Sequence, residues 1–104
     1  MTFEELKEDI DIVTASAALI NFSVEFYKDI NVTNNTVNIG YYYFFRKNDK
    51  YMFTIYAIAL DNVTDTIQHV ELCKSGKSFI SIDNPSKQDI VKSMPKLLKK
   101  IVKE

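Results

Sequence analysis

The stretch Gly40-Tyr41-Tyr42-Tyr43-Phe44-Phe45-Arg46 places five aromatic residues in a row, directly before the only arginine of the chain. Successive side chains of a strand point to opposite faces of a sheet, so a strand of this composition is apolar on both faces. Strands of this kind are normally buried on both sides. We therefore expect a central strand with helices on both faces of its sheet, or with a barrel-like curl over one face.

Turn residues on either side of this stretch predict a five-stranded sheet. Asn48-Asp49 and Ser75-Gly76 are two-residue hairpin signals, and polar clusters at 31–35 and 61–65 mark two further turns. They separate strands that we expect at 22–30, 36–47, 50–60, 66–74 and 77–82. Connections this short favour an antiparallel meander. The first strand alternates apolar and polar residues, which predicts a half-buried edge strand with an inner face of Phe22, Val24, Phe26 and Ile30.

Helix signals lie at both ends of the chain. Thr2-Phe3-Glu4-Glu5 has the pattern of a capping box, and apolar residues at three- and four-residue steps predict a helix over 3–20. Asp83-Asn84-Pro85 predicts the start of a second helix. Pro95 lacks the amide that a helix interior needs, so we expect this helix to be kinked there or split into 86–94 and 96–103.

These elements together predict a single α+β domain over residues 1–104. Its order is an N-terminal helix, a five-stranded antiparallel meander sheet and a C-terminal helix kinked or split at Pro95. The 104 residues are 46% hydrophobic and 26% charged, which is sufficient for a folded core.

The charge of the chain is small in total but unevenly placed. The formal net charge is −1, so no overall field attracts nucleic acid. Residues 1–35 hold seven acids and two lysines, whereas residues 72–104 hold eight lysines and three acids.

A single cysteine allows no internal disulfide, and no apolar run reaches membrane length. We expect a cytoplasmic protein without a membrane partner.

No catalytic or cofactor-binding set is recognisable in the sequence. His69 and Cys73 would lie roughly 13 Å apart on one strand, too far to share a proton, and together they make a poor zinc site. Two glycines cannot form a glycine-rich phosphate loop. We therefore predict no enzyme activity, no cofactor and no metal.

Arg46 is a candidate anchor for an anionic ligand; the alternative is an ion pair with Asp49 or an N-terminal acid.

Two further groups of residues could contact a partner. The six tyrosines could stack nucleotide bases on an open sheet face, or could form core and rim: Tyr27, Tyr41, Tyr42, Tyr43, Tyr51 and Tyr56. The last predicted helix carries four lysines that could bind an acidic surface of another protein, or a membrane. The alternative is a helix that packs Leu97, Ile101 and Val102 onto the domain and leaves the lysines solvated: Lys96, Lys99, Lys100 and Lys103.

Part of the chain resembles the SH2 domain family. Tyr43-Phe44-Phe45-Arg46 is similar to the Phe-Leu-Val-Arg strand of that family, and Gln68–Leu72 resembles its later strand with a phosphotyrosine-pocket histidine. Lys77–Ile82 and Ser86–Val91 resemble the strand and helix that follow, so the similarity covers residues 43–94. The resemblance implies phosphotyrosine-peptide binding, with the phosphate gripped by the arginine. The predicted ligand-binding residues are Arg46, Lys47, Lys50 and His69.

Two features depart from the SH2 pattern. A long helix precedes a long strand at the start of the chain, and the loop after the arginine, which wraps the phosphate in that family, shrinks to Asn48-Asp49. In the register that the hairpins predict, Arg46 faces Tyr51. His69 then lies near Ala57, roughly 20 Å away along the strand.

The sequence supports three functional hypotheses. The first is a non-enzymatic protein-binding module, a small inhibitor or immunity-type protein from a phage, virus or mobile element. The second is an SH2-like protein that binds a phosphotyrosine peptide. The third is a small nucleotide or nucleic-acid binder that uses an aromatic sheet face. Basic residues around that face would support the third hypothesis, whereas the net charge of −1 argues against nucleic acid.

Overall fold

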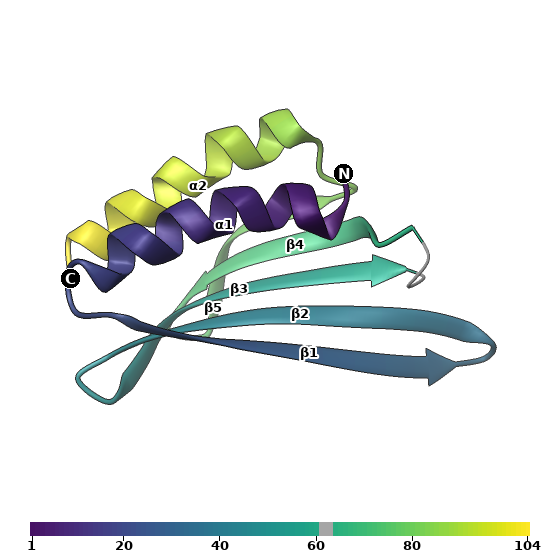
Figure 1. Ribbon diagram of the computed structural model, residues 1–104, viewed down its shortest axis with the longest axis horizontal. Helices are drawn as coiled ribbons and strands as arrows, with labels where there is room; N and C mark the ends of the chain where they lie inside the picture. The colour runs from purple at the N-terminus through teal and green to yellow at the C-terminus, as the bar shows by residue number, and fades with distance from the viewer. Residues whose placement is uncertain (61–63) are drawn as a thin grey trace.

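One helix, five strands and a second helix follow each other along the chain and form two layers (Figure 1). The computed structural model describes residues 1–60 and 64–104. Its elements are α1 (Phe3–Ala18), β1 (Ser23–Thr33), β2 (Thr36–Lys47), β3 (Lys50–Leu60), β4 (Thr66–Lys74), β5 (Lys77–Asp83) and α2 (Lys87–Val102). The strands pair antiparallel in the order β1-β2-β3-β4-β5, which confirms the predicted α+β meander. Of the predicted turn at 61–65, residues 61–63 lie outside the described residues.

Both helices pack side by side on the same face of the sheet (Figure 1). The side chains of β2 alternate accordingly. Tyr41, Tyr43 and Phe45 are buried on the helix side, whereas Tyr42 and Phe44 point to the other face and are only partly buried. For the described residues, the expectation of cover on both faces is therefore wrong. The rings on the uncovered face are instead shielded by packing against one another.

The core lies between the helix pair and the covered face of the sheet. Each helix presents one apolar stripe at three- and four-residue steps, which is the pattern that packs a helix onto a core. The stripe of α1 is Phe3, Leu6, Ile10, Val13 and Ala17, and that of α2 is Ile90, Met94, Leu97 and Ile101. The largest fully buried side chains of the sheet are Phe45, Phe53, Ile39, Ile55, Ile67 and Leu72.

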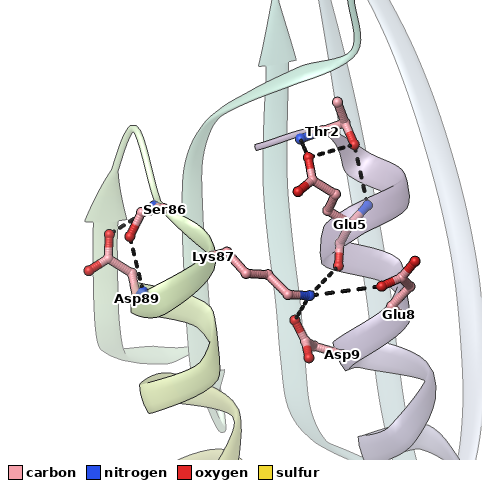
Figure 2. Close-up of polar contacts among 7 residues, drawn as sticks. All are labelled: Thr2, Glu5, Glu8, Asp9, Ser86, Lys87 and Asp89. Carbon is pink, nitrogen blue, oxygen red and sulfur yellow. Dashed lines mark hydrogen bonds and ion pairs between the residues drawn. The ribbon is translucent and has the colours of Figure 1, made fainter.

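Two capping boxes begin the helices, as Figure 2 shows. The amide of Thr2 donates to Glu5 Oε1 at 3.0 Å and the amide of Glu5 donates to Thr2 Oγ1 at 3.3 Å, so two amides of the first turn are satisfied. Ser86 and Asp89 make the same exchange at 2.9 and 3.2 Å. These hydrogen bonds lower the pKa of the Glu5 and Asp89 carboxyls. The second cap is therefore Ser86, just after the predicted Asp83-Asn84-Pro85 signal.

Lys87 links the two helices (Figure 2). Its Nζ lies 2.6 Å from Asp9 Oδ2 and 4.0 Å from Glu8 Oε2, and it donates to the backbone carbonyl of Glu5 at 3.2 Å. The hydrogen bond to Asp9 raises the pKa of the Lys87 ammonium. The acid-rich first helix and the lysine-rich last helix thus meet at their N-terminal halves.

α2 continues through Pro95 as one helix, so the predicted split into 86–94 and 96–103 is wrong. The proline removes the helix hydrogen bond to the carbonyl of Val91. Both residues are exposed, so water can satisfy that carbonyl. A kink at Pro95 stays a prediction.

β1 is longer and more exposed than predicted. It runs to Thr33, because Asn34 and Asn35 both have positive φ and form the hairpin turn by themselves. β1 is the sheet edge that the sequence predicts. Its Phe26 and Ile30 are nevertheless 50% and 56% exposed, because β1 lies at the edge of the sheet. The Phe26 ring still packs against Phe3 of α1, with 6.0 Å between the ring centroids. The β1–β2 hairpin extends past the N-terminal end of α1 (Figure 1).

Truncation of the buried face of α1 should destabilise the protein. Ile10 is fully buried, so Ile10→Ala should lower the free energy of unfolding by about 2–5 kcal/mol through lost apolar contacts and the cavity left behind. Ile12 lies exposed on the same helix, and Ile12→Ala should change that free energy by less than about 0.5 kcal/mol. Urea unfolding followed by circular dichroism measures both variants. Equal effects would contradict the assignment of the two helix faces.

Candidate functional site

The uncovered face of the sheet carries five aromatic side chains from three adjacent strands. We call this surface the aromatic face: Tyr27, Tyr42, Phe44, Tyr51 and Tyr56. Strand register aligns Tyr27 of β1, Tyr42 of β2 and Tyr56 of β3 in one row. Phe44 and Tyr51 extend the surface toward the β2–β3 hairpin.

The rings of the aromatic face form one continuous cluster. Centroid separations are 5.9 Å for Tyr27–Tyr42, 4.8 Å for Tyr42–Tyr56, 5.9 Å for Tyr42–Phe44 and 6.0 Å for Phe44–Tyr51. Tyr27 and Tyr51, at the two ends, are 57% and 55% exposed. Burial, together with the neighbouring Tyr42, raises the pKa of Tyr56 to about 12. At neutral pH this central phenol therefore stays uncharged.

Gly40 leaves room for the central ring of the cluster. A Cβ at position 40 would lie 3.0 Å from Tyr42 Cε2 and 3.1 Å from Tyr42 Oη, closer than side chains normally approach. The Tyr42 ring thus occupies space that any other residue at position 40 would need.

A hollow of about 430 Å³ opens at one end of the aromatic face. It is lined by Glu25, Phe44, Tyr51, Met52, Thr54, Ser75 and Gly76. The aromatic and methionine side chains make it mainly apolar, while the Glu25 carboxylate places one negative charge at its rim. A hollow of this size can accommodate a large side chain or a small ligand.

Acidic residues border the aromatic face on both sides. By register, four carboxylates from β1, β4 and β5 point to the same face as Tyr42: Glu25, Asp29, Glu71 and Asp83. Among the described residues, the basic groups on that face are Arg46 and His69. Each of these lies beside one or more of the carboxylates, so the surface as a whole is negative.

Arg46 forms an exposed ion pair with Glu25, one of the residues that line the hollow. Its Nη2 is 3.8 Å from Glu25 Oε1, and its guanidinium carbon is 5.8 Å from the centroid of the Tyr51 ring. The side chains of Arg46 and Glu25 are 38% and 49% exposed. Of the two partners that the sequence allowed, the structure selects an acid from the N-terminal part of the chain rather than Asp49.

His69 is held between two carboxylates at the opposite end of the face. Its Nδ1 lies 2.7 Å from Asp83 Oδ1 and its Nε2 lies 3.0 Å from Glu71 Oε1. The hydrogen bond to Glu71, helped by that to Asp83 and opposed by burial, raises the pKa of the imidazole.

The four predicted ligand-binding residues do not form one pocket. Arg46 faces Tyr51 as predicted, but His69 pairs with Ile58 rather than Ala57, because a bulge between Ile58 and Ala59 shifts the register by one residue. The two residues are therefore roughly 23 Å apart along β3.

Lys47 and Lys50 face each other across the β2–β3 hairpin. Lys47 turns to the helix side, where its Nζ lies 5.3 Å from the Phe22 ring centroid and donates to the Glu104 carbonyl at 3.0 Å. Lys50 is exposed.

The four predicted partner-binding lysines do lie together. Lys96, Lys99, Lys100 and Lys103 line a groove of about 390 Å³ between α2 and β5, with Phe79 and Ile80 on its other side. The Nζ of Lys100 lies 4.9 Å from the centroid of the Phe79 ring. Sequence reasoning missed Phe79, because its position beside α2 depends on a bulge in the β4–β5 pairing.

No protein-family model, curated protein or solved structure matches this chain. In the two described ranges, 1–60 and 64–104, neither helix is long and apolar enough to cross a bilayer.

Removal of the Arg46 side chain should change stability little. Both members of the Arg46–Glu25 pair are more than one-third exposed, so solvent screens their attraction. Arg46→Ala should lower the free energy of unfolding by less than about 1 kcal/mol in urea denaturation. A loss of about 3 kcal/mol or more would mean that the substitution strands a buried charge, contrary to the exposed geometry.

Stability should depend on pH through His69. Because the folded-state pKa is raised above the ordinary value of about 6.5, the protonated imidazole stabilises the fold below that pH, and this contribution is lost as pH rises through the folded-state pKa. His69→Gln should therefore destabilise the protein more at about pH 5.5 than at about pH 8.5 in urea unfolding. The same loss at both pH values would contradict the two carboxylate contacts.

Proposed function

We propose that this protein is a non-enzymatic protein-binding module that contacts its partner through the aromatic face. The observation that carries the proposal is the group of five clustered rings on a sheet face that neither helix covers. Large contiguous apolar patches are uncommon on soluble proteins unless they serve as interaction sites.

Tyrosine-rich surfaces suit protein recognition for two physical reasons. A tyrosine ring buries a large area at a low cost in conformational entropy, and its hydroxyl group retains a hydrogen-bonding partner at the edge of the contact. Aromatic residues are accordingly enriched among the residues that dominate binding energy. The partly buried Tyr42 and Tyr56 would form the centre of such a contact, with the more exposed Tyr27 and Tyr51 around them.

The charges around the aromatic face favour a protein partner over nucleic acid. Single-stranded nucleic acid binds where cationic groups follow the phosphates beside stacking rings. Here the carboxylates of Glu25, Asp29, Glu71 and Asp83 border the rings and would repel phosphates. The partner surface that complements this face carries arginine or lysine side chains, which can pair with the acids and stack on the rings.

A phosphotyrosine-peptide reader is the second candidate function. It is favoured by Arg46, which contacts Glu25 and Tyr51, two residues that line an apolar hollow large enough for a ring. A bound phosphate would have to displace the Glu25 carboxylate from the guanidinium. We rank this function second because His69 lies at the far end of the face.

The setting that we propose for the module is a small cytoplasmic inhibitor or immunity-type protein of a phage, virus or mobile element. Its twelve lysines to one arginine fit an AT-rich coding sequence, and its single free cysteine suits a reducing compartment.

Disruption of the aromatic face should abolish partner binding. In affinity capture from a lysate of the source cells, a specific partner should be retained by the wild-type protein and lost with Tyr42→Ser/Tyr56→Ser. In calorimetry with the purified partner, the double substitution should weaken the free energy of binding by at least about 2 kcal/mol, because these positions would be central to the contact.

The matched control variant is Ile12→Ser/Val102→Ser, which removes two exposed apolar side chains from the helix layer. It should bind the partner as the wild type does, and thermal unfolding should show that both variants are folded. Equal affinity of the folded aromatic-face variant would refute the proposal. Binding of a tyrosine-phosphorylated peptide that requires Arg46 would instead select the second candidate.

A further inference from the structure

A groove lies on the helix side of the molecule, at the edge formed by β5 and α2. We call it the lysine groove: Phe79, Ile80, Lys96, Lys99, Lys100 and Lys103. Its residues come from elements that do not contribute to the aromatic face. Its function is therefore separate from the one proposed above.

The four lysines concentrate positive charge that the protein itself does not neutralise. Within residues 1–60 and 64–104, none of them forms an ion pair. Two other lysines of the protein are paired: Lys74 with Glu104 at 2.8 Å and Lys87, at the start of α2, with Asp9 at 2.6 Å. A cluster of cations beside a concave apolar surface attracts an anionic ligand.

Beside the four lysines, the free edge of β5 supplies backbone hydrogen-bonding groups. β5 ends the strand order, so in the described part of the chain only its β4 side is paired. An unpaired edge presents amides and carbonyls to which an extended segment can add as a further strand. A bulge between Leu72 and Cys73 leaves Phe79 without a partner on β4, and its ring lies beside Lys100.

We propose that the lysine groove binds an acidic, extended peptide segment, which adds to the edge of β5 as a sixth strand. Every second side chain of an extended segment points to the same side. Acidic residues at alternate positions would therefore all face the lysines of α2, while their methylene groups contact Phe79 and Ile80. The backbone of the segment would pair with the free edge of β5.

The test uses a fluorescein-labelled octapeptide of alternating glutamate and valine, with fluorescence anisotropy as the readout at about 50 mM salt. The wild-type protein should bind it, and Lys96→Glu/Lys100→Glu should weaken binding at least about tenfold because attraction becomes repulsion. The control Lys50→Glu/Lys92→Glu makes the same change in net charge outside the groove, and should weaken binding less than about threefold.

A second peptide separates strand addition from simple charge attraction. The same octapeptide, N-methylated at alternate residues, keeps its charge but loses the amides that would pair with β5, and should bind at least about tenfold more weakly. The Tyr42→Ser/Tyr56→Ser variant should bind the unmodified octapeptide normally, so failure of one proposal can be distinguished from failure of the other.

Four results would overturn this inference. They are no binding of the octapeptide by wild-type protein, equal losses in the two lysine variants, undiminished binding of the N-methylated peptide, and tighter binding of a twelve-nucleotide single-stranded RNA at the same groove. The last result would identify the groove as a nucleic-acid site.

Discussion

The two helices, of 16 residues each, pack side by side on one face of the five-stranded sheet, so neither helix covers the other face. Apolar stripes centred on Ile10 of α1 and Leu97 of α2 pack onto the same face, and Lys87 ties the helices together through Asp9. Burial of one face therefore determines both the core and the surface that stays uncovered. The aromatic residues of β2 are divided between these two roles by their alternation alone.

On the uncovered face, each aromatic ring is partly shielded from water because it packs against rings on its own strand or on neighbouring strands. Tyr42 contacts Tyr27, Phe44 and Tyr56, so the hydrophobic surface is partly buried within the sheet layer itself. On the other layer, α2 places its lysines against the edge strand β5. The protein thus presents an acidic, aromatic surface on the uncovered face of the sheet and a basic groove between α2 and β5.

Most of the fold could be predicted from signals between residues close in the sequence. Features that depend on contacts between distant residues could not. Capping residues, hairpin turns and periodicity act within a few residues, so α1 and all five strands were recognisable in the sequence. The run of aromatic residues before Arg46 indicated cover on both faces, because a single sequence does not reveal that rings on neighbouring strands will pack together. Bulges such as the one between Ile58 and Ala59 shift the register of strand pairing, and they leave no local signal in the sequence. The residue predicted to pair with His69 was therefore wrong by one position. The lysines of α2 lie together along one groove, and their apolar neighbours on β5 could not be recognised from the sequence.

The proposed function requires that the aromatic face is open in the free protein and closed in the complex with the partner. Hydroxyl-radical footprinting with mass spectrometry tests it directly, because oxidation of each tyrosine reports its exposure. In the free protein, Tyr27 and Tyr51 should react readily while Tyr41 and Tyr43 are protected, in line with their exposed and buried positions. Saturation with the partner should protect Tyr27 and Tyr51 as well. Undiminished oxidation of these two residues in the saturated complex would show that the partner does not bind through the aromatic face.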